Sequence, residues 1–200
     1  MKHRLVLLGP PASGKGTLAE RLCNDFGFQT ASPGAMLREE FPNLASDGKL
    51  LGDEVINSLV VKWLDRQAGH RFVFDGYPRT MVQGRALDTT LAQRNEPLDL
   101  VVLLEADDAT LRSRIARRAG CRQCGRILSV EDNDAHCTCG GILFRRSDDT
   151  AEVLDKRLSE YSEKTEPLIG YYENKGLLER FDATQPADAV YETVRTTLLA

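Results

Sequence analysis

Residues 9–17 read Gly-Pro-Pro-Ala-Ser-Gly-Lys-Gly-Thr, a glycine-rich loop with one lysine near its end. Small residues let the backbone curl around an anion with its N–H groups pointing inward, and Lys15 adds a full positive charge. Thr17 supplies a hydroxyl suited to the shell of a Mg²⁺ ion, although Gly16 stands where the strict P-loop pattern has Ser or Thr. Phosphate binding is therefore the first expectation, and an ordinary strand-to-helix turn is the alternative.

A carboxylate and a guanidinium follow an apolar run further along the chain. Residues 72–74 read Phe-Val-Phe and lead directly into Asp75 and, four residues later, Arg79. Ligands of parallel sheets bind beyond the carboxyl ends of the strands, so Gly9 and Asp75 are predicted to converge on one crevice. Glu105 also follows a predicted strand. The alternative for Asp75 and Arg79 is a solvated ion pair in a loop.

Four of the five cysteines lie between Cys121 and Cys139, in a spacing typical of a metal site. Cys121 and Cys124 are two residues apart with a glycine after the second. His136 and Cys139 repeat that arrangement, so we prefer the ligand set Cys121, Cys124, His136 and Cys139, with Cys137 in place of His136 as the alternative. Either set is closed and suits a structural Zn²⁺ rather than a catalytic one.

Basic residues border the cysteine-rich segment on both sides. Arg114 and Arg118 are four apart on a predicted helix at 107–118, where their side chains are neighbours. Arg145 and Arg146 follow the cysteines. Arg157 lies on a further helix, which Asp149 is predicted to cap.

Apolar runs and helical stripes alternate along the chain. Strands are predicted at 5–8, 28–31, 72–74, 100–104 and 177–181, with helices between them. The alternation indicates an α/β fold with a parallel sheet. Residues 32–65 are predicted to form a helical insertion between two strands. Pro167 is predicted to end one helix and open the next.

Composition is that of an ordinary globular protein, with 42% hydrophobic and 28% charged residues and a net charge of −4. The acidic balance argues against a nucleic-acid partner, and no stretch is long enough to cross a membrane. The N-terminal apolar run is too short for a signal peptide. Clustered cysteines without an export signal indicate a reducing compartment, so we expect a cytoplasmic protein.

These motifs together resemble the adenylate kinase family, specifically the bacterial type with a long lid, over essentially the whole chain. Residues 75–80 read Asp-Gly-Tyr-Pro-Arg-Thr and resemble the family's Asp-Gly-Phe-Pro-Arg-Thr motif. Residues 146–149 and 156–158 resemble the lid motifs, and 171–172 and 184–186 resemble the C-terminal signature.

The resemblance implies a P-loop NTP-kinase fold, with a parallel five-stranded sheet flanked by helices. It implies a core at 1–31, 66–118 and 150–200, a helical NMP-binding insertion at 32–65 and a zinc-bearing lid at 119–149. A monomer is expected, because closing domains need room to move. The small-molecule partners would be ATP, AMP and ADP.

The resemblance also assigns site residues. The positions expected near ATP are Ala12, Ser13, Gly14, Lys15, Gly16, Thr17, Arg114, Arg118, Ile127, Leu128 and Gln185. The positions expected near AMP are Pro33, Arg38, Lys49, Leu50, Leu51, Gly76, Tyr77, Pro78, Arg79, Gln83, Arg146 and Arg157. The residues expected to act in catalysis are Lys15, Arg79, Arg114, Arg146, Arg157, Asp148 and Asp149. Asp75 and Thr17 would hold Mg²⁺ through water.

The implied reaction is Mg·ATP + AMP ⇌ 2 ADP. Phosphoryl transfer needs alignment, charge neutralisation and exclusion of water, and arginines supply the first two because their planar forks stay charged. Pro33 and Ala35 depart from the family pattern near the acceptor base, where threonine and aspartate are usual. Ala12 in the glycine-rich loop and Ala183 near the ATP base each replace a glycine of the family pattern. The alternatives are a kinase for another nucleoside monophosphate, a nucleotide-operated switch without turnover, and a zinc-ribbon module that binds nucleic acid.

Overall fold

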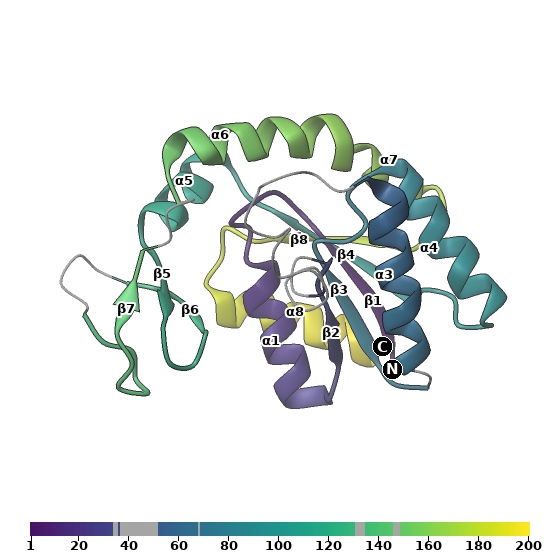
Figure 1. The fold of residues 1–200 in the computed structure, drawn as a ribbon, viewed down its shortest axis with the longest axis horizontal. Helices are drawn as coiled ribbons and strands as arrows, with labels where there is room; N and C mark the ends of the chain where they lie inside the picture. Colours follow the sequence, from purple (N-terminus) through teal and green to yellow (C-terminus); the bar gives the residue numbers. More distant parts are fainter. Residues whose placement is uncertain (34–35, 37–51, 68, 131–134, 146–148) are drawn as a thin grey trace.

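The computed structural model describes residues 1–33, 36, 52–67, 69–130, 135–145 and 149–200. A five-stranded sheet has the order β2-β3-β1-β4-β8, and each neighbouring pair is parallel (Figure 1). Its strands are β1 (Arg4–Leu8), β2 (Gln29–Ala31), β3 (Phe72–Asp75), β4 (Leu100–Glu105) and β8 (Leu178–Asp182). The predicted α/β class and the parallel five-stranded sheet are therefore confirmed.

Helices cover both faces of this sheet. One face carries α1 (Lys15–Phe26) and α8 (Ala187–Leu199), and the other carries α3 (Asp53–Arg66), α4 (Met81–Gln93) and α7 (Pro167–Glu173). Side chains alternate between the faces of a strand, so Leu5 and Leu7 pack with α1 and α8 while Val6 and Leu8 pack with the other layer. Burial on both faces explains why β1 is a continuous apolar run.

The remaining elements connect the sheet to a small outlying subdomain. They are α5 (Asp108–Ala116), β5 (Arg118–Cys121), β6 (Ile127–Ser129), β7 (Leu143–Phe144), α6 (Ala151–Glu160) and the π-helical turn η1 (Tyr161–Thr165). Strands β6, β5 and β7 form a separate antiparallel sheet that projects to one side of the molecule (Figure 1). The domain boundaries given above remain predictions.

Two local predictions are wrong in detail. The helix expected at 107–118 is capped by the Asp107 carboxylate, which accepts from Thr110 N at 2.7 Å, and it ends at Ala116, so that Arg118 opens β5. The cap of α6 is Thr150, which accepts from Val153 N at 3.3 Å, rather than Asp149. Asp149 instead forms an ion pair described below. Pro167 opens α7 as predicted.

The two ends of the chain lie together, because Lys2 N donates to Leu198 O at 3.0 Å. Among the helices that the structure describes, none is both long and apolar enough to cross a membrane.

Candidate active site and metal centre

The loop between β1 and α1 is closed around the Lys15 ammonium group. The backbone is left-handed at Ala12 (φ 64°) and Gly14 (φ 104°), and α1 begins at the next residue. Lys15 Nζ donates to Gly9 O at 2.7 Å and to Pro10 O at 2.8 Å. A full positive charge thus lies at the N-terminus of a helix, which is an arrangement that attracts anions.

Gly9 is required by close packing. A β-carbon there would lie 2.5 Å from Leu104 O and 2.8 Å from Ser13 Oγ, and the φ of 140° is one that L side chains rarely adopt. Any larger residue would push the loop away from the end of β4. This contact fixes the loop beyond the carboxyl ends of the strands.

Asp75 and the loop lysine belong to one electrostatic group, as the strand order predicts. A β-carbon on Gly16 would lie 3.5 Å from Asp75 Oδ2, so the carboxylate faces the first turn of α1. Burial lowers the pKa of Lys15 to about 8; the Asp75 charge opposes this shift, and Arg79 and Arg157 add to it. Burial raises the pKa of Asp75, against the effect of Lys15 and Arg79. Three cations and one carboxylate therefore share the mouth of the site.

The Arg79 side chain folds back along its own loop. Its Nε donates to Gly76 O at 2.8 Å, and its carbonyl accepts from Thr165 Oγ1 at 2.9 Å. A β-carbon on Gly76 would lie 3.0 Å from Arg79 Nη2. Glycine at position 76 therefore leaves space for the guanidinium group beside Asp75.

Two of the predicted arginines have fixed partners. Arg114 of α5 bonds to backbone carbonyls, and Arg118 at the start of β5 bonds to a carboxylate. Arg114 donates to Ser13 O at 3.2 Å and to Ala183 O at 2.5 Å, and it thereby joins the loop between β1 and α1 to the turn after β8. Arg118 forms a two-point ion pair with Asp149, in which Nε lies 2.8 Å from Oδ2. The Asp149 side chain is only 3% exposed, so its carboxylate is shielded from water where it pairs with the first residue of β5.

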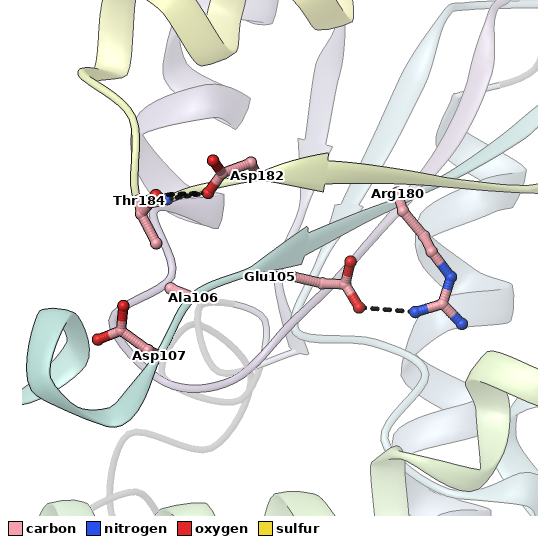
Figure 2. A pocket seen from close by; sticks show the side chains of 6 residues that line it. All are labelled: Glu105, Ala106, Asp107, Arg180, Asp182 and Thr184. Atoms are coloured by element: carbon pink, nitrogen blue, oxygen red, sulfur yellow. Dashed lines mark hydrogen bonds and ion pairs between the residues drawn. The ribbon is translucent and has the colours of Figure 1, made fainter.

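A hollow of about 390 Å³ opens beyond the ends of β4 and β8 (Figure 2). It is lined by Glu105, Ala106, Asp107, Arg180, Asp182 and Thr184. Arg180 donates to Glu105 Oε1 at 2.6 Å, and Asp182 Oδ1 accepts from Thr184 N at 2.9 Å. Gln185 Nε2 donates to Asp182 Oδ2 at 3.0 Å. The predicted position Gln185 is thus held by Asp182, one of the residues that line this polar hollow.

The segment after β3 is held by α3 through polar contacts that sequence reasoning missed. Tyr77 is 1% exposed, and its hydroxyl donates to Asn57 Oδ1 at 2.8 Å. Asp53 accepts from Thr80 Oγ1 at 2.8 Å and from Gln83 Nε2 at 2.7 Å. Asp53 and Asn57 are four residues apart on one helix face, and Asn57 interrupts the apolar stripe there. A polar residue at this place among apolar ones is the sequence signal from which these contacts could have been predicted.

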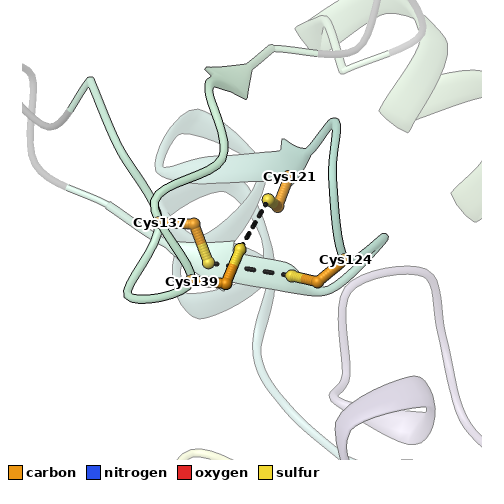
Figure 3. Close-up of side chains that lie close together, drawn as sticks. All are labelled: Cys121, Cys124, Cys137 and Cys139. Carbon is orange, nitrogen blue, oxygen red and sulfur yellow. Dashed lines mark hydrogen bonds between the residues drawn. The ribbon is translucent and has the colours of Figure 1, made fainter.

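Four cysteine sulfur atoms converge in the small subdomain (Figure 3). Cys121 Sγ lies 3.5 Å from Cys139 Sγ, Cys124 Sγ lies 3.8 Å from Cys137 Sγ, and all four lie within 4.8 Å of one another. A tetrahedral zinc ion with Zn–S bonds of about 2.3 Å sets its sulfur ligands roughly 3.8 Å apart. The four residues therefore fit a closed structural zinc site.

This arrangement corrects our preference for His136 in favour of Cys137. Cys137 N donates to Gly141 O at 2.8 Å, and Gly140 N donates to Cys137 O at 2.8 Å, so Cys137 opens the turn that carries Cys139. His136 instead pairs with Ile142 in an antiparallel bridge. Neighbouring residues of an extended segment point to opposite sides, so only one of His136 and Cys137 can face the other thiols.

Arg126 lies against the thiols from outside. Its Nε is 3.5 Å from Cys124 Sγ and its Nη2 is 3.7 Å from Cys137 Sγ. The hydrogen bond from Arg126 lowers the pKa of Cys124 to about 6, which favours the thiolate that binds metal. Arginine also offsets the negative charge that four thiolates bring together.

The other predicted positions have varied surroundings. Thr17 is exposed in the first turn of α1, Pro33 is buried after β2, and Pro78 is buried beside Tyr77. Ile127 and Leu128 lie on β6 in the small sheet. Six predicted site residues lie outside the described residues: Arg38, Lys49, Leu50, Leu51, Arg146 and Asp148.

Comparison with known proteins gives a consistent result. The family model for adenylate kinase matches residues 7–177. The chain is 39% identical over 206 residues to an adenylate kinase of Paracoccus denitrificans, covering 95% of this chain and 94% of that protein. It is 37% identical over 210 residues to one of Methanosarcina acetivorans, covering 97% of each. A Carboxydothermus hydrogenoformans adenylate kinase is 35% identical over 211 residues, covering 98% of this chain and 99% of the relative.

Proposed function

Because the chain belongs to the adenylate kinase family, which transfers phosphoryl groups between adenine nucleotides, we propose that it catalyses Mg·ATP + AMP ⇌ 2 ADP. Its role would be to keep the adenine nucleotides in balance. The observation that carries this proposal is the grouping of Lys15, Asp75, Arg79 and Arg157 beyond the carboxyl ends of the parallel strands.

The donor would bind at the loop between β1 and α1. Its phosphates would accept from the loop N–H groups of residues 12–17 and from Lys15, whose ammonium would exchange two carbonyl partners for phosphate oxygens. Arg114 already lies between this loop and Ala183, and Arg118 lies at the entrance to the small sheet. Ile127, Leu128 and Gln185 would border the donor on its outer side.

The acceptor would bind on the Asp75–Gln83 side of the crevice. Arg79 lies beside Asp75, within the field of Lys15 and Arg157, so it is suited to an acceptor phosphate. Arg157 extends that positive field toward the transferring group, and arginine there would neutralise charge on it. Gln83 would contact the base. Pro33, Arg38, residues 49–51 and Arg146 complete the proposed acceptor site by resemblance.

Mg²⁺ with ATP is the family's usual metal, and it would neutralise phosphate charge when bound. Asp75 is a suitable holder through water because its carboxylate faces the first turn of α1, where Thr17 also lies. Neither residue needs to move a proton. The reaction asks the chain only to orient the two nucleotides and to keep water out.

The zinc-binding lid at 119–149 would close over the donor, and the insertion at 32–65 would close over the acceptor. Four cysteines leave no ligand position open, so the metal would stabilise the lid rather than take part in the chemistry. Asp149 is suited to orient the lid through its ion pair with Arg118, with Asp148 beside it in sequence. We further propose a cytoplasmic monomer without a nucleic-acid or membrane partner.

The test is ADP formation by purified protein with Mg·ATP and each of AMP, GMP, CMP and UMP. We expect rapid turnover with AMP. Lys15→Ala and Arg79→Ala should each lower kcat/KM by about 100-fold or more, because each removes a charged phosphate contact. Arg85→Ala, which removes an exposed arginine of α4, is the matched control and should change little. A folded wild-type protein without turnover on any acceptor would refute the proposal.

A further inference from the structure

Asp53 forms two hydrogen bonds to the segment that follows β3. One carboxylate oxygen accepts from Thr80 Oγ1 at 2.8 Å and the other accepts from Gln83 Nε2 at 2.7 Å. Asp53 is the first residue of α3, whereas Thr80 and Gln83 are the cap and third residue of α4. The carboxylate therefore joins the first turns of two helices.

The same amide of Gln83 has a second fixed partner. Its Oε1 accepts from Arg79 N at 2.7 Å. A carboxylate can only accept hydrogen bonds and a backbone N–H can only donate one, so the two neighbours leave one favourable orientation of the amide. Rotating the amide by 180° would set oxygen against oxygen at Asp53 and N–H against N–H at Arg79. Gln83 is 6% exposed, which makes unpaired groups costly there.

A fixed amide can distinguish purines. Each of its two polar atoms can form a second hydrogen bond, so the amide can offer one donor and one acceptor in a set order. Adenine presents an N6–H donor beside the N1 acceptor, and a glutamine amide pairs with such an edge at two points. Hypoxanthine presents the reverse, an O6 acceptor beside an N1–H donor. It would suit the amide only after rotation.

We propose that Asp53 is a specificity-determining residue, which holds the Gln83 amide in the orientation that selects adenine over 6-oxopurines. This inference rests on the proposed function, since Gln83 must face the acceptor base. Asp53 acts through Gln83 and is a positioning residue. The Thr80 contact holds the carboxylate in place, and the Arg79 contact supports the same amide orientation from the other side.

A purely structural role for Asp53 is the competing explanation. An acidic residue in the first turn of a helix stabilises that helix through its dipole, and Asp53 and Glu54 both satisfy this. Glu54 is exposed, whereas Asp53 is half-buried. Glu54→Ala is thus a matched control, because it removes the same charge from the same turn without touching Gln83.

The experiment compares AMP with IMP, which differ only at the purine edge. Turnover with Mg·ATP and equilibrium binding by calorimetry are measured for wild type, Asp53→Ala, Asp53→Asn and Glu54→Ala. We expect the AMP-over-IMP ratio of kcat/KM to fall about tenfold in Asp53→Ala, chiefly because KM for AMP rises. A loss of this size is about the contribution of one charge-assisted hydrogen bond. Asp53→Asn should retain most of the ratio, because its Oδ1 can still accept from Gln83. Glu54→Ala should retain all of it.

The outcomes separate this inference from the proposed function. A selective wild type with an unchanged ratio in Asp53→Ala would overturn the inference alone, as would an equal loss in Asp53→Ala and Glu54→Ala. A wild type that binds AMP selectively without turnover would overturn the proposed reaction, while the binding ratios would still decide the role of Asp53. A wild type that neither binds nor converts AMP would overturn both.

Discussion

Gly141 lies where an added methyl group would disturb the four cysteines. A β-carbon at this position would be 2.6 Å from Cys121 Sγ, 2.6 Å from Gln123 Cβ and 3.3 Å from Cys139 Sγ. Non-bonded heavy atoms prefer separations of about 3.5–4.0 Å, so Cys121 Sγ and Gln123 Cβ would each have to retreat by about 1 Å. Metal sites tolerate changes in ligand distance of roughly 0.2 Å.

Gly141→Ala should therefore weaken metal binding markedly. Overpacking of this kind costs about 1–3 kcal/mol, which corresponds to about 5- to 150-fold in affinity. The assay is competition for Zn²⁺ against a chromophoric chelator, together with the thiolate–metal absorption of the Co²⁺-substituted protein. We expect faster zinc loss and a weaker, shifted Co²⁺ spectrum.

The matched control is Gly140→Asn in the same turn. A β-carbon there would meet no atom within 4 Å, and asparagine tolerates the φ of 84° better than other residues with side chains. It should bind metal nearly as wild type does. If Gly141→Ala also retained wild-type zinc affinity and the Co²⁺ spectrum, the packing argument would be refuted.

Two further predictions concern the active site. The pKa of Lys15 is about 8 in the folded protein, against 10.5 ordinarily. Between pH 8 and 10.5 the lysine is therefore protonated in the unfolded chain and largely neutral in the folded one. In that range the ligand-free protein should become more stable as pH rises. Because ATP favours the protonated form of Lys15, its binding near pH 8.5 should take up a proton, and its affinity should fall above that pH. Calorimetry in two buffers of different ionisation enthalpy measures this proton uptake. Lys15→Arg should abolish it. Tyr77→Phe removes the hydrogen bond to Asn57 Oδ1 and should lower the free energy of unfolding in urea by about 1 kcal/mol. Unchanged stability would contradict that reasoning.

The parallel sheet could be predicted because each of its strands is marked by neighbouring residues in the sequence. Each strand is a short apolar run, and β1 in particular is buried on both faces, so its four consecutive apolar residues leave little ambiguity. The position of Asp75 followed from a general rule about strand ends. Nothing beyond chain order was needed to expect it near Lys15.

The ligand choice between His136 and Cys137 depended on information that spacing does not contain. Both fit a knuckle-like arrangement with Cys139 in the linear sequence. The decision lies in backbone pairing: His136 bridges to Ile142, and Cys137 bonds to Gly141 and Gly140. A one-residue shift of that pairing would exchange the two side chains between the faces.

Non-local ion pairs were equally hidden. Asp149 has the right type and position for a helix cap, yet Arg118, thirty-one residues earlier, pairs with its carboxylate. The cap then falls to Thr150, whose hydroxyl can accept from Val153 N. A two-point contact between full charges is stronger than a neutral cap hydrogen bond, so the distant partner prevails over the local preference.

The contacts of Gln83 imply that base recognition and phosphate recognition are not independent in the proposed reaction. Its Oε1 holds Arg79 N, and the Arg79 guanidinium turns back to Gly76 O beside Asp75. A base that rotated the amide would remove the hydrogen bond from Arg79 N and loosen the loop that presents the guanidinium. A wrong purine would therefore be penalised twice, in binding and in the alignment of its phosphate, so IMP should show a lower kcat as well as a higher KM.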